Sequence, residues 1–183
     1  MNKIGSLICA AVCAASLSFV GCDKVPSPET MSNLAGHIGI ATAIAVNEFA
    51  DLTPEVRNAT VDIMNEVRAV IPETNQTFEA AWTPIAEAHI AKLVADGKLD
   101  EKLAPIVLIV AKAVFKGIDF AFAKYPKAFE VKEVVVAGVN GFFGGFLTWF
   151  KPANSLSVAN SMKVDYDKDA YDHIKGFLSS QKK

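Results

Sequence analysis

The strongest constraint on this fold is a series of helix start and stop signals along the chain. Thr53-Pro54-Glu55 combines a capping hydroxyl, a proline suited to the first helical position and an acid in the first turn. Asp100 is placed to cap another helix. The signals that end helices are Pro72, Asp96-Gly97 and Pro126. These signals divide the middle of the chain into segments of helical length.

Apolar residues recur at helical spacing within these segments, as Val56, Thr60, Ile63 and Val67 do. The predicted helices cover residues 29–50, 54–71, 77–95, 100–125, 133–150 and 167–179. Thr83-Pro84 either kinks the third helix or restarts it. The helix over 100–125 is apolar around most of its circumference, which suits the centre of a bundle. We therefore expect an all-α fold, a single bundle of five to six helices.

The segment EVVVAGVNGFFGGFLTWF, residues 133–150, permits two structures. As a helix it has a face of small residues, in which Gly141 and Gly145 form a G-x-x-x-G pair. As a β-hairpin over residues 131–150 it would turn at Asn140-Gly141, which suits a type I′ turn. We favour the helix, because no other segment offers a strand to extend a sheet.

This segment is either the buried last helix of the bundle or an element that contacts a membrane or a protein partner. Its 18 residues are about the shortest run that could cross a bilayer. Each glycine costs a helix about 1 kcal/mol relative to alanine, so a stripe of three predicts a compensating close helix contact. The residues of this predicted packing or contact face are Gly138, Gly141, Gly145, Phe143, Phe146, Trp149 and Phe150.

The N-terminus has the layout of an export signal, with Lys3, then an apolar run, then a return of charge at Asp23. A retained N-terminal membrane anchor is the alternative. The run ends in Phe19-Val20-Gly21-Cys22, which resembles the lipobox of bacterial lipoprotein precursors. The resemblance covers only the first two dozen residues, and Phe19 departs from the leucine usual at its position. It implies cleavage before Cys22 after a lipid carrying fatty acids such as palmitate is attached to the thiol.

The resemblance and the helix signals together predict a domain organisation, and the resemblance also implies a location. Residues 1–21 would be the signal peptide, and 22–29 the lipidated terminus with a proline-containing spacer. Residues 30–151 would form the bundle, and 152–183 a loop and a C-terminal amphipathic helix. Asp23 resembles the signal that retains lipoproteins on the periplasmic face of the inner membrane; an outer-membrane location is the alternative.

Composition and motifs exclude several function classes. The chain has 18 basic and 20 acidic residues, with the basic ones scattered singly, so we expect no nucleic-acid partner. Cys9 and Cys13 lie in the predicted signal, which leaves no free thiol for catalysis or metal binding. Asp165, Asp167 and Asp169 imitate an EF-hand start, but Ala170 stands where that loop needs glycine. We expect no metal, no cofactor and no catalytic residue.

These observations predict a non-catalytic function at a membrane surface. We expect a lipid-anchored envelope protein that acts as an interaction module, with the lipid on Cys22 in the membrane and an envelope protein as its partner. Its role would be inhibitory, exclusion-related or structural. The alternative is a helical protein that binds a lipid ligand or inserts into the membrane.

Overall fold

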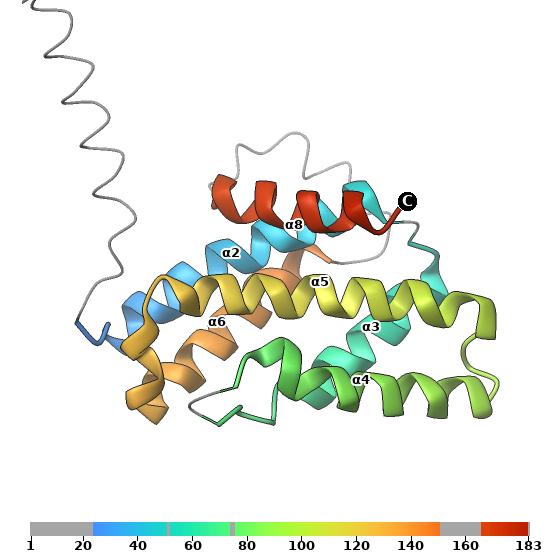
Figure 1. The fold of residues 1–183 in the computed structure, drawn as a ribbon, viewed down its shortest axis with the longest axis horizontal. Helices are drawn as coiled ribbons and strands as arrows, with labels where there is room; N and C mark the ends of the chain where they lie inside the picture. Colours follow the sequence, from blue (N-terminus) through green and yellow to red (C-terminus); the bar gives the residue numbers. More distant parts are fainter. Residues whose placement is uncertain (1–23, 51, 74–75, 151–165, 183) are drawn as a thin grey trace, which may run out of the picture.

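The structure is a computed structural model that describes residues 24–50, 52–73, 76–150 and 166–182. These residues contain six α-helices and no strand, which confirms the predicted all-α bundle and rules out the hairpin over 131–150 (Figure 1). The α-helices are α2 (Pro28–Phe49), α3 (Pro54–Val67), α4 (Phe78–Ala95), α5 (Ala104–Ala123), α6 (Lys132–Trp149) and α8 (Lys168–Ser180). The short 3₁₀ helices η2 (Glu101–Leu103) and η3 (Pro126–Glu130) flank α5.

Side-chain caps set the helix starts. The hydroxyls of Thr53 and Thr77 accept backbone N–H groups at the starts of α3 and α4. Ser27 does the same for α2, which therefore begins at Pro28 and takes in the last residues of the expected spacer 22–29. The helix α4 continues through Pro84 without restarting.

The bounds of two predicted helices differ from the structure. The helix α3 ends at Val67, well before the proline at position 72 would require it to stop. The helix expected from residue 100 begins as η2, which Asp100 caps, and α5 follows from Ala104. After α3, the Val70 carbonyl accepts a hydrogen bond of 2.7 Å from the Trp82 indole N–H, which ties this segment to α4.

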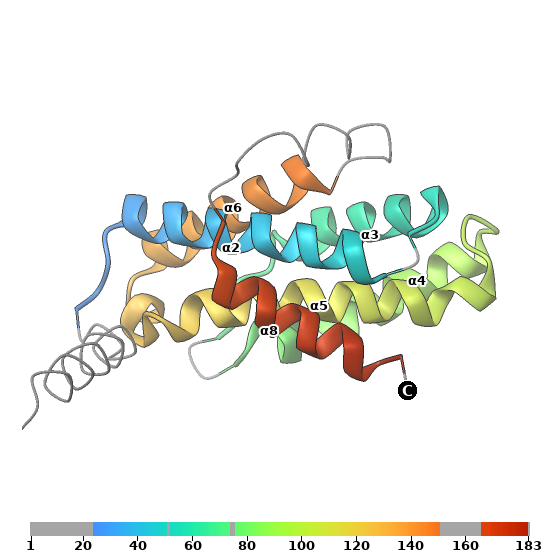
Figure 2. The same cartoon turned by 90° about the horizontal axis from the view of Figure 1, so that it is seen from above.

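The helix α5 lies at the centre of the bundle, as its apolar circumference predicts. It packs against α2, α3, α4 and α8, while the most extensive helix pair is α2 with α6 (Figures 1 and 2). The aromatic rings of α4, α5 and α6 meet in the core: Trp82 lies with its ring centre 4.7 Å from Phe78, 5.4 Å from Phe115 and 5.7 Å from Phe143. This filled core fixes which side of α6 faces inward.

The helix α8 docks onto α2 and α5 through a narrow apolar stripe (Figure 2). The buried residues of that stripe are Ala170, Ile174 and Leu178. The Lys124 ammonium lies 2.7 Å from a carboxylate oxygen of Asp167, which also caps α8 by accepting the Ala170 N–H. At the other side, the hydroxyl of Tyr171 donates to Glu48, which raises the pKa of Tyr171 to about 12.

Acid is expected to weaken the docking of α8 through Asp167. Burial opposes the charge of this carboxylate, but hydrogen bonds from Lys124 and Ala170 outweigh it and lower its pKa. A lowered pKa stabilises the fold above the ordinary value of about 4, and this contribution is lost as the pH falls through the folded pKa. Between about pH 5 and pH 2, the free energy of unfolding should therefore fall more steeply in the natural chain than in Asp167→Asn. Equal slopes would contradict this contribution.

Candidate functional site

The glycine stripe of α6 lies against the backbone of α2. A Cβ atom added to Gly141 would collide with the carbonyl oxygen of Ser32, and one added to Gly145 with that of Gly36. The contact is reciprocal, because a Cβ on Gly39 would strike the backbone of α6 at Phe142. The two helix backbones therefore approach as closely as their glycines allow.

The third glycine of the stripe faces side chains. A Cβ on Gly138 would lie 2.8 Å from the Phe122 ring and 2.9 Å from Met31 Cγ. Met31 and Ser32 face the start of α6, and Gly36 and Gly39 face its later turns, so the two helices run parallel. All three glycines of the predicted contact face thus lie inside the domain.

The aromatic residues of the predicted contact face are also largely internal. Phe143, Phe146 and Phe150 are buried, whereas Trp149 is half-buried. The Trp149 carbonyl accepts a hydrogen bond of 3.0 Å from the Asn47 side chain. As the structure places it, this face packs the bundle and offers little surface to a partner.

A buried arginine, Arg57, helps to hold the end of α6, and it was not predicted from the sequence. Arg57 donates a hydrogen bond of 2.8 Å to Asn47, which in turn holds the Trp149 carbonyl, and its guanidinium lies 5.4 Å from the centre of the Phe150 ring. Burial lowers the pKa of Arg57. No local pattern marks this residue, because its partners are distant in sequence.

The opposite side of α6 is exposed and carries a second row of residues spaced one turn apart. This outward row consists of Val136, Asn140, Gly144 and Thr148. A Cβ added to Gly144 would meet no atom within 4 Å, in contrast to one on the neighbouring Gly145. Val136 is 37% exposed, which is unusual for a large apolar residue of this domain. The outward row is thus open to a partner.

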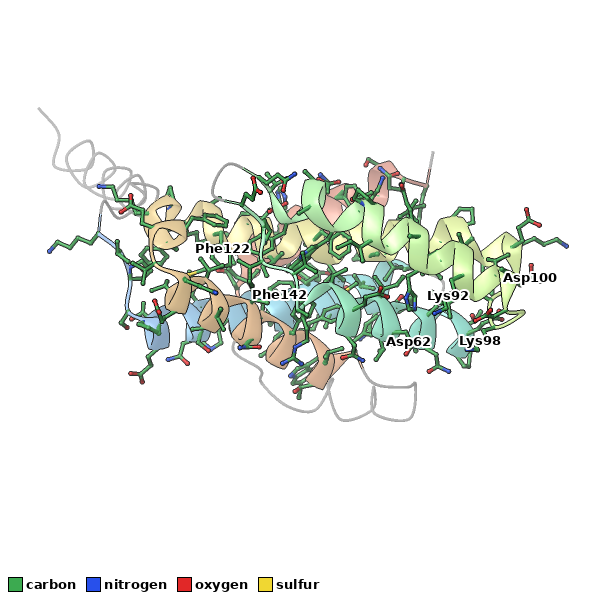
Figure 3. All side chains as sticks on the ribbon, turned by 90° about the horizontal axis from the view of Figure 1, so that it is seen from below. Asp62, Lys92, Lys98, Asp100, Phe122 and Phe142 are labelled. Atoms are coloured by element: carbon green, nitrogen blue, oxygen red, sulfur yellow. The ribbon has the colours of Figure 1, made fainter. Side chains whose placement is uncertain are left out.

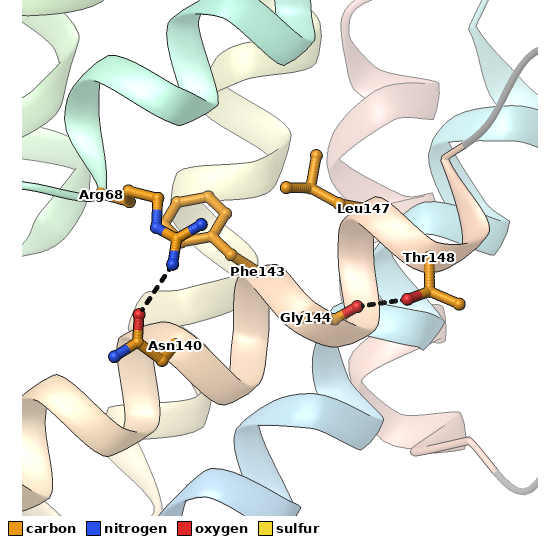
Figure 4. Close-up of a pocket in the computed structure, with 6 residues that line it drawn as sticks. All are labelled: Arg68, Asn140, Phe143, Gly144, Leu147 and Thr148. Atoms are coloured by element: carbon orange, nitrogen blue, oxygen red, sulfur yellow. Dashed lines mark hydrogen bonds between the residues drawn. The ribbon is translucent and has the colours of Figure 1, made fainter.

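Two adjoining open grooves lie along the outward row, where α6 faces the C-terminal end of α3. They share the Arg68 and Asn140 side chains, which are joined by a hydrogen bond of 3.1 Å (Figure 4). The first groove, of about 280 Å³, is lined by Arg68, Asn140, Phe143, Gly144, Leu147 and Thr148. The second, of about 430 Å³, is lined by Arg68, Ala69, Ile71, Lys132, Val136, Val139 and Asn140. We call the two together the α6 groove.

The α6 groove is positively charged. Its lining includes Arg68 and Lys132 and no carboxylate, and neither cation has an ion-pair partner among the described residues. A groove of about 390 Å³ between α3 and α4 has the opposite character, with Glu55 and Asp62 beside Lys98 (Figure 3 labels the last two). The domain therefore presents two grooves of different charge.

An acidic cluster between α4 and α5 serves a structural role. Asp119 on α5 accepts the backbone N–H groups of Phe78 at 2.7 Å and Glu79 at 3.1 Å, and so caps the start of α4. Burial raises the pKa of Asp119, while these hydrogen bonds oppose the rise. Lys116 pairs with Glu79 at 2.8 Å beside it. This arrangement docks α4 on the central helix.

Two of the three histidines make structural contacts as well. His89 pairs with Glu66, and His173 stacks on Phe120 at 5.1 Å between ring centres. In residues 24–50, 52–73, 76–150 and 166–182, no three His, Cys, Asp or Glu side chains lie close enough to hold a metal ion. Asp167, one of the three aspartates that imitate an EF-hand, caps α8, and Asp165 lies outside the described residues.

Within the described part of the chain, no helix is long and apolar enough to span a membrane. No protein-family model, curated protein or solved structure matches the chain.

Proposed function

We propose that this chain is a lipid-anchored envelope protein whose helical domain binds another protein at the membrane surface. The observation that carries the proposal is the α6 groove, an open, positively charged surface that includes the exposed Val136 on an otherwise filled bundle. Exposed apolar surface rimmed by polar groups is typical of a protein-binding site. The described pockets are open and partly charged, which favours surface binding over the alternative of sheltering a lipid ligand in an apolar cavity.

The proposed anchor rests on the lipobox-like sequence before Cys22, which lies outside the described residues. Five peptide units join Cys22 to the Ser27 cap of α2, so this tether spans at most about 18 Å. Because α2 and α6 run parallel, the tether would hold the starts of both helices near the bilayer. The Lys132 end of the α6 groove would then lie closest to the membrane.

The anchor is tested by Cys22→Ser in the full chain, expressed in a bacterium that processes lipoproteins. We expect the precursor to remain uncleaved at this site and to take up no radioactive palmitate, because the thiol that carries the lipid is gone. The natural chain should be labelled and found in the membrane fraction. Normal processing and labelling of Cys22→Ser would contradict the lipid anchor.

A further inference from the structure

We propose that the α6 groove binds an acidic, amphipathic helix of a protein partner. This inference rests on the proposed function and adds the chemistry and shape of the partner. Charge, groove length and the exposed small residues of α6 each contribute one part of the description.

Charge complementarity identifies the partner as anionic. Arg68 and Lys132 project from different elements into one groove that contains no carboxylate. Arg68 contacts only the neutral amide of Asn140 there, so its charge is not compensated by the residues around it. Two such cations beside apolar surface can pair with carboxylates on a partner. Complementary charges fix the orientation of the bound partner, and the cations repel competing partners that are positively charged.

The outward row of α6 identifies the partner's shape as a helix. From Lys132 to Thr148 the groove follows about 24 Å of helix, enough for about four turns of a second helix. At Gly144 no side chain stands between the α6 backbone and solvent, and Thr148 one turn further on is small. Small residues one turn apart permit a second helix to approach closely, as the inner glycines do for α2.

Apolar residues supply contact area along the groove. Val136 is exposed, and Ile71 and Leu147 are half-buried along the groove walls. An elongated groove that combines apolar walls with two cations fits the face of an amphipathic helix, whose anchors recur every three to four residues. A lipid headgroup would need only a compact cluster of cations, so the length of the groove favours the helix.

The test uses a photo-crosslinking amino acid in the full-length, membrane-anchored protein, in the cells that naturally produce it. One variant carries the probe at Val136 in the α6 groove. Three controls carry it at Asn58 in the acidic groove, at Glu87 on α4 and at Lys175 on α8, all exposed. We expect a protein crosslink from Val136 and not from the controls. Mass spectrometry should map it to a segment with carboxylates at helical spacing.

A synthetic peptide of the mapped segment then measures binding to the soluble domain. We expect Gly144→Leu to abolish binding, and Arg68→Glu to weaken it about tenfold or more, because one removes the close approach and the other repels the carboxylates. Lys98→Glu in the acidic groove is the matched charge control and should bind like the natural chain. Melting temperatures of all variants show whether they fold; Gly144 and Arg68 are exposed, so their replacement should leave the fold intact.

The outcomes separate this inference from the proposed function. A protein crosslinked only through a control position would overturn the acidic-helix proposal and leave an interaction module. Crosslinks to lipid alone, or to no protein from any position, would overturn both. A crosslink to a second copy of this chain, or to a segment without carboxylates, would also contradict the inference, as would a folded Gly144→Leu variant that binds normally.

Discussion

Gly141→Leu is expected to lower the free energy of unfolding by about 3 kcal/mol, because a side chain at this position would need the space that the backbone of α2 fills. The nearest obstacle is the carbonyl oxygen of Ser32, which belongs to a helix and cannot rotate away as a flexible side chain could. Relief would require α2 and α6 to separate. Their interface is the most extensive helix pair in the domain, so the loss should be measurable by urea unfolding.

The matched control is Gly144→Leu, three residues further along the same helix. The outward side is open there, so an added Cβ meets no atom within 4 Å and the rest of the side chain can extend into the open groove, while the helix loses a flexible glycine. Its stability should equal or exceed that of the natural chain. If Gly141→Leu unfolds at the same urea concentration as Gly144→Leu, the internal position of the glycine stripe is wrong.

Trp82→Ala is expected to lower the free energy of unfolding by about 3–5 kcal/mol, the range for deleting a large buried aromatic ring. The side chain is fully buried and contacts Phe78, Phe115 and Phe143, so its loss would leave a cavity among α4, α5 and α6. It would also remove the hydrogen bond to the Val70 carbonyl. Urea unfolding followed by far-UV circular dichroism measures the change.

Trp82→Phe separates the two contributions of this residue. It keeps an aromatic ring in the core but removes the indole N–H, so we expect a smaller loss than for the alanine variant, including about 0.5–1.5 kcal/mol for the lost hydrogen bond to the Val70 carbonyl. Losses below about 1 kcal/mol for Trp82→Ala would contradict the packing of the core around this ring.

The helices could be predicted because their signals are local. Thr53 and its proline, or Asp167 before α8, contain within a few residues the groups that start a helix. The start of α2 and the end of α3 differ from the prediction. Ser27 is itself a cap, although it lies within the predicted spacer 22–29. No stop signal in the sequence marks Val67 as the end of α3, because Pro72 lies five residues further on.

The two-sided nature of α6 was visible in the sequence, but its orientation was not. The stripe of Gly138, Gly141 and Gly145 fits either an internal contact or a surface, and only its partner decides between them. The partner's signal lies in Gly36 and Gly39 of α2, two glycines that by themselves only lower the helix propensity of their segment. Matching glycine pairs on two predicted helices would have indicated that these helices pack against each other.

The α6 groove could not be predicted, because its parts come from distant segments. Arg68 and Asn140 are 72 residues apart in the chain and meet only when α3 and α6 pack. The same holds for Arg57, whose contacts with Asn47 and Phe150 hold the end of α6. The basic residues are scattered singly along the sequence, so nothing in it indicates that Arg68 and Lys132 share one surface.

The orientation of α6 is the central claim, since it assigns one face to packing and leaves the other free to bind. Alanine variants of two adjacent glycines test it by the sign of the effect. Gly144→Ala should raise the free energy of unfolding by up to about 1 kcal/mol, because alanine favours the helix and its methyl group meets nothing. Gly145→Ala has the same intrinsic preference but collides with the carbonyl of Gly36, so it should lower the free energy of unfolding. Opposite signs are the predicted result; an equal gain in both variants would contradict the account.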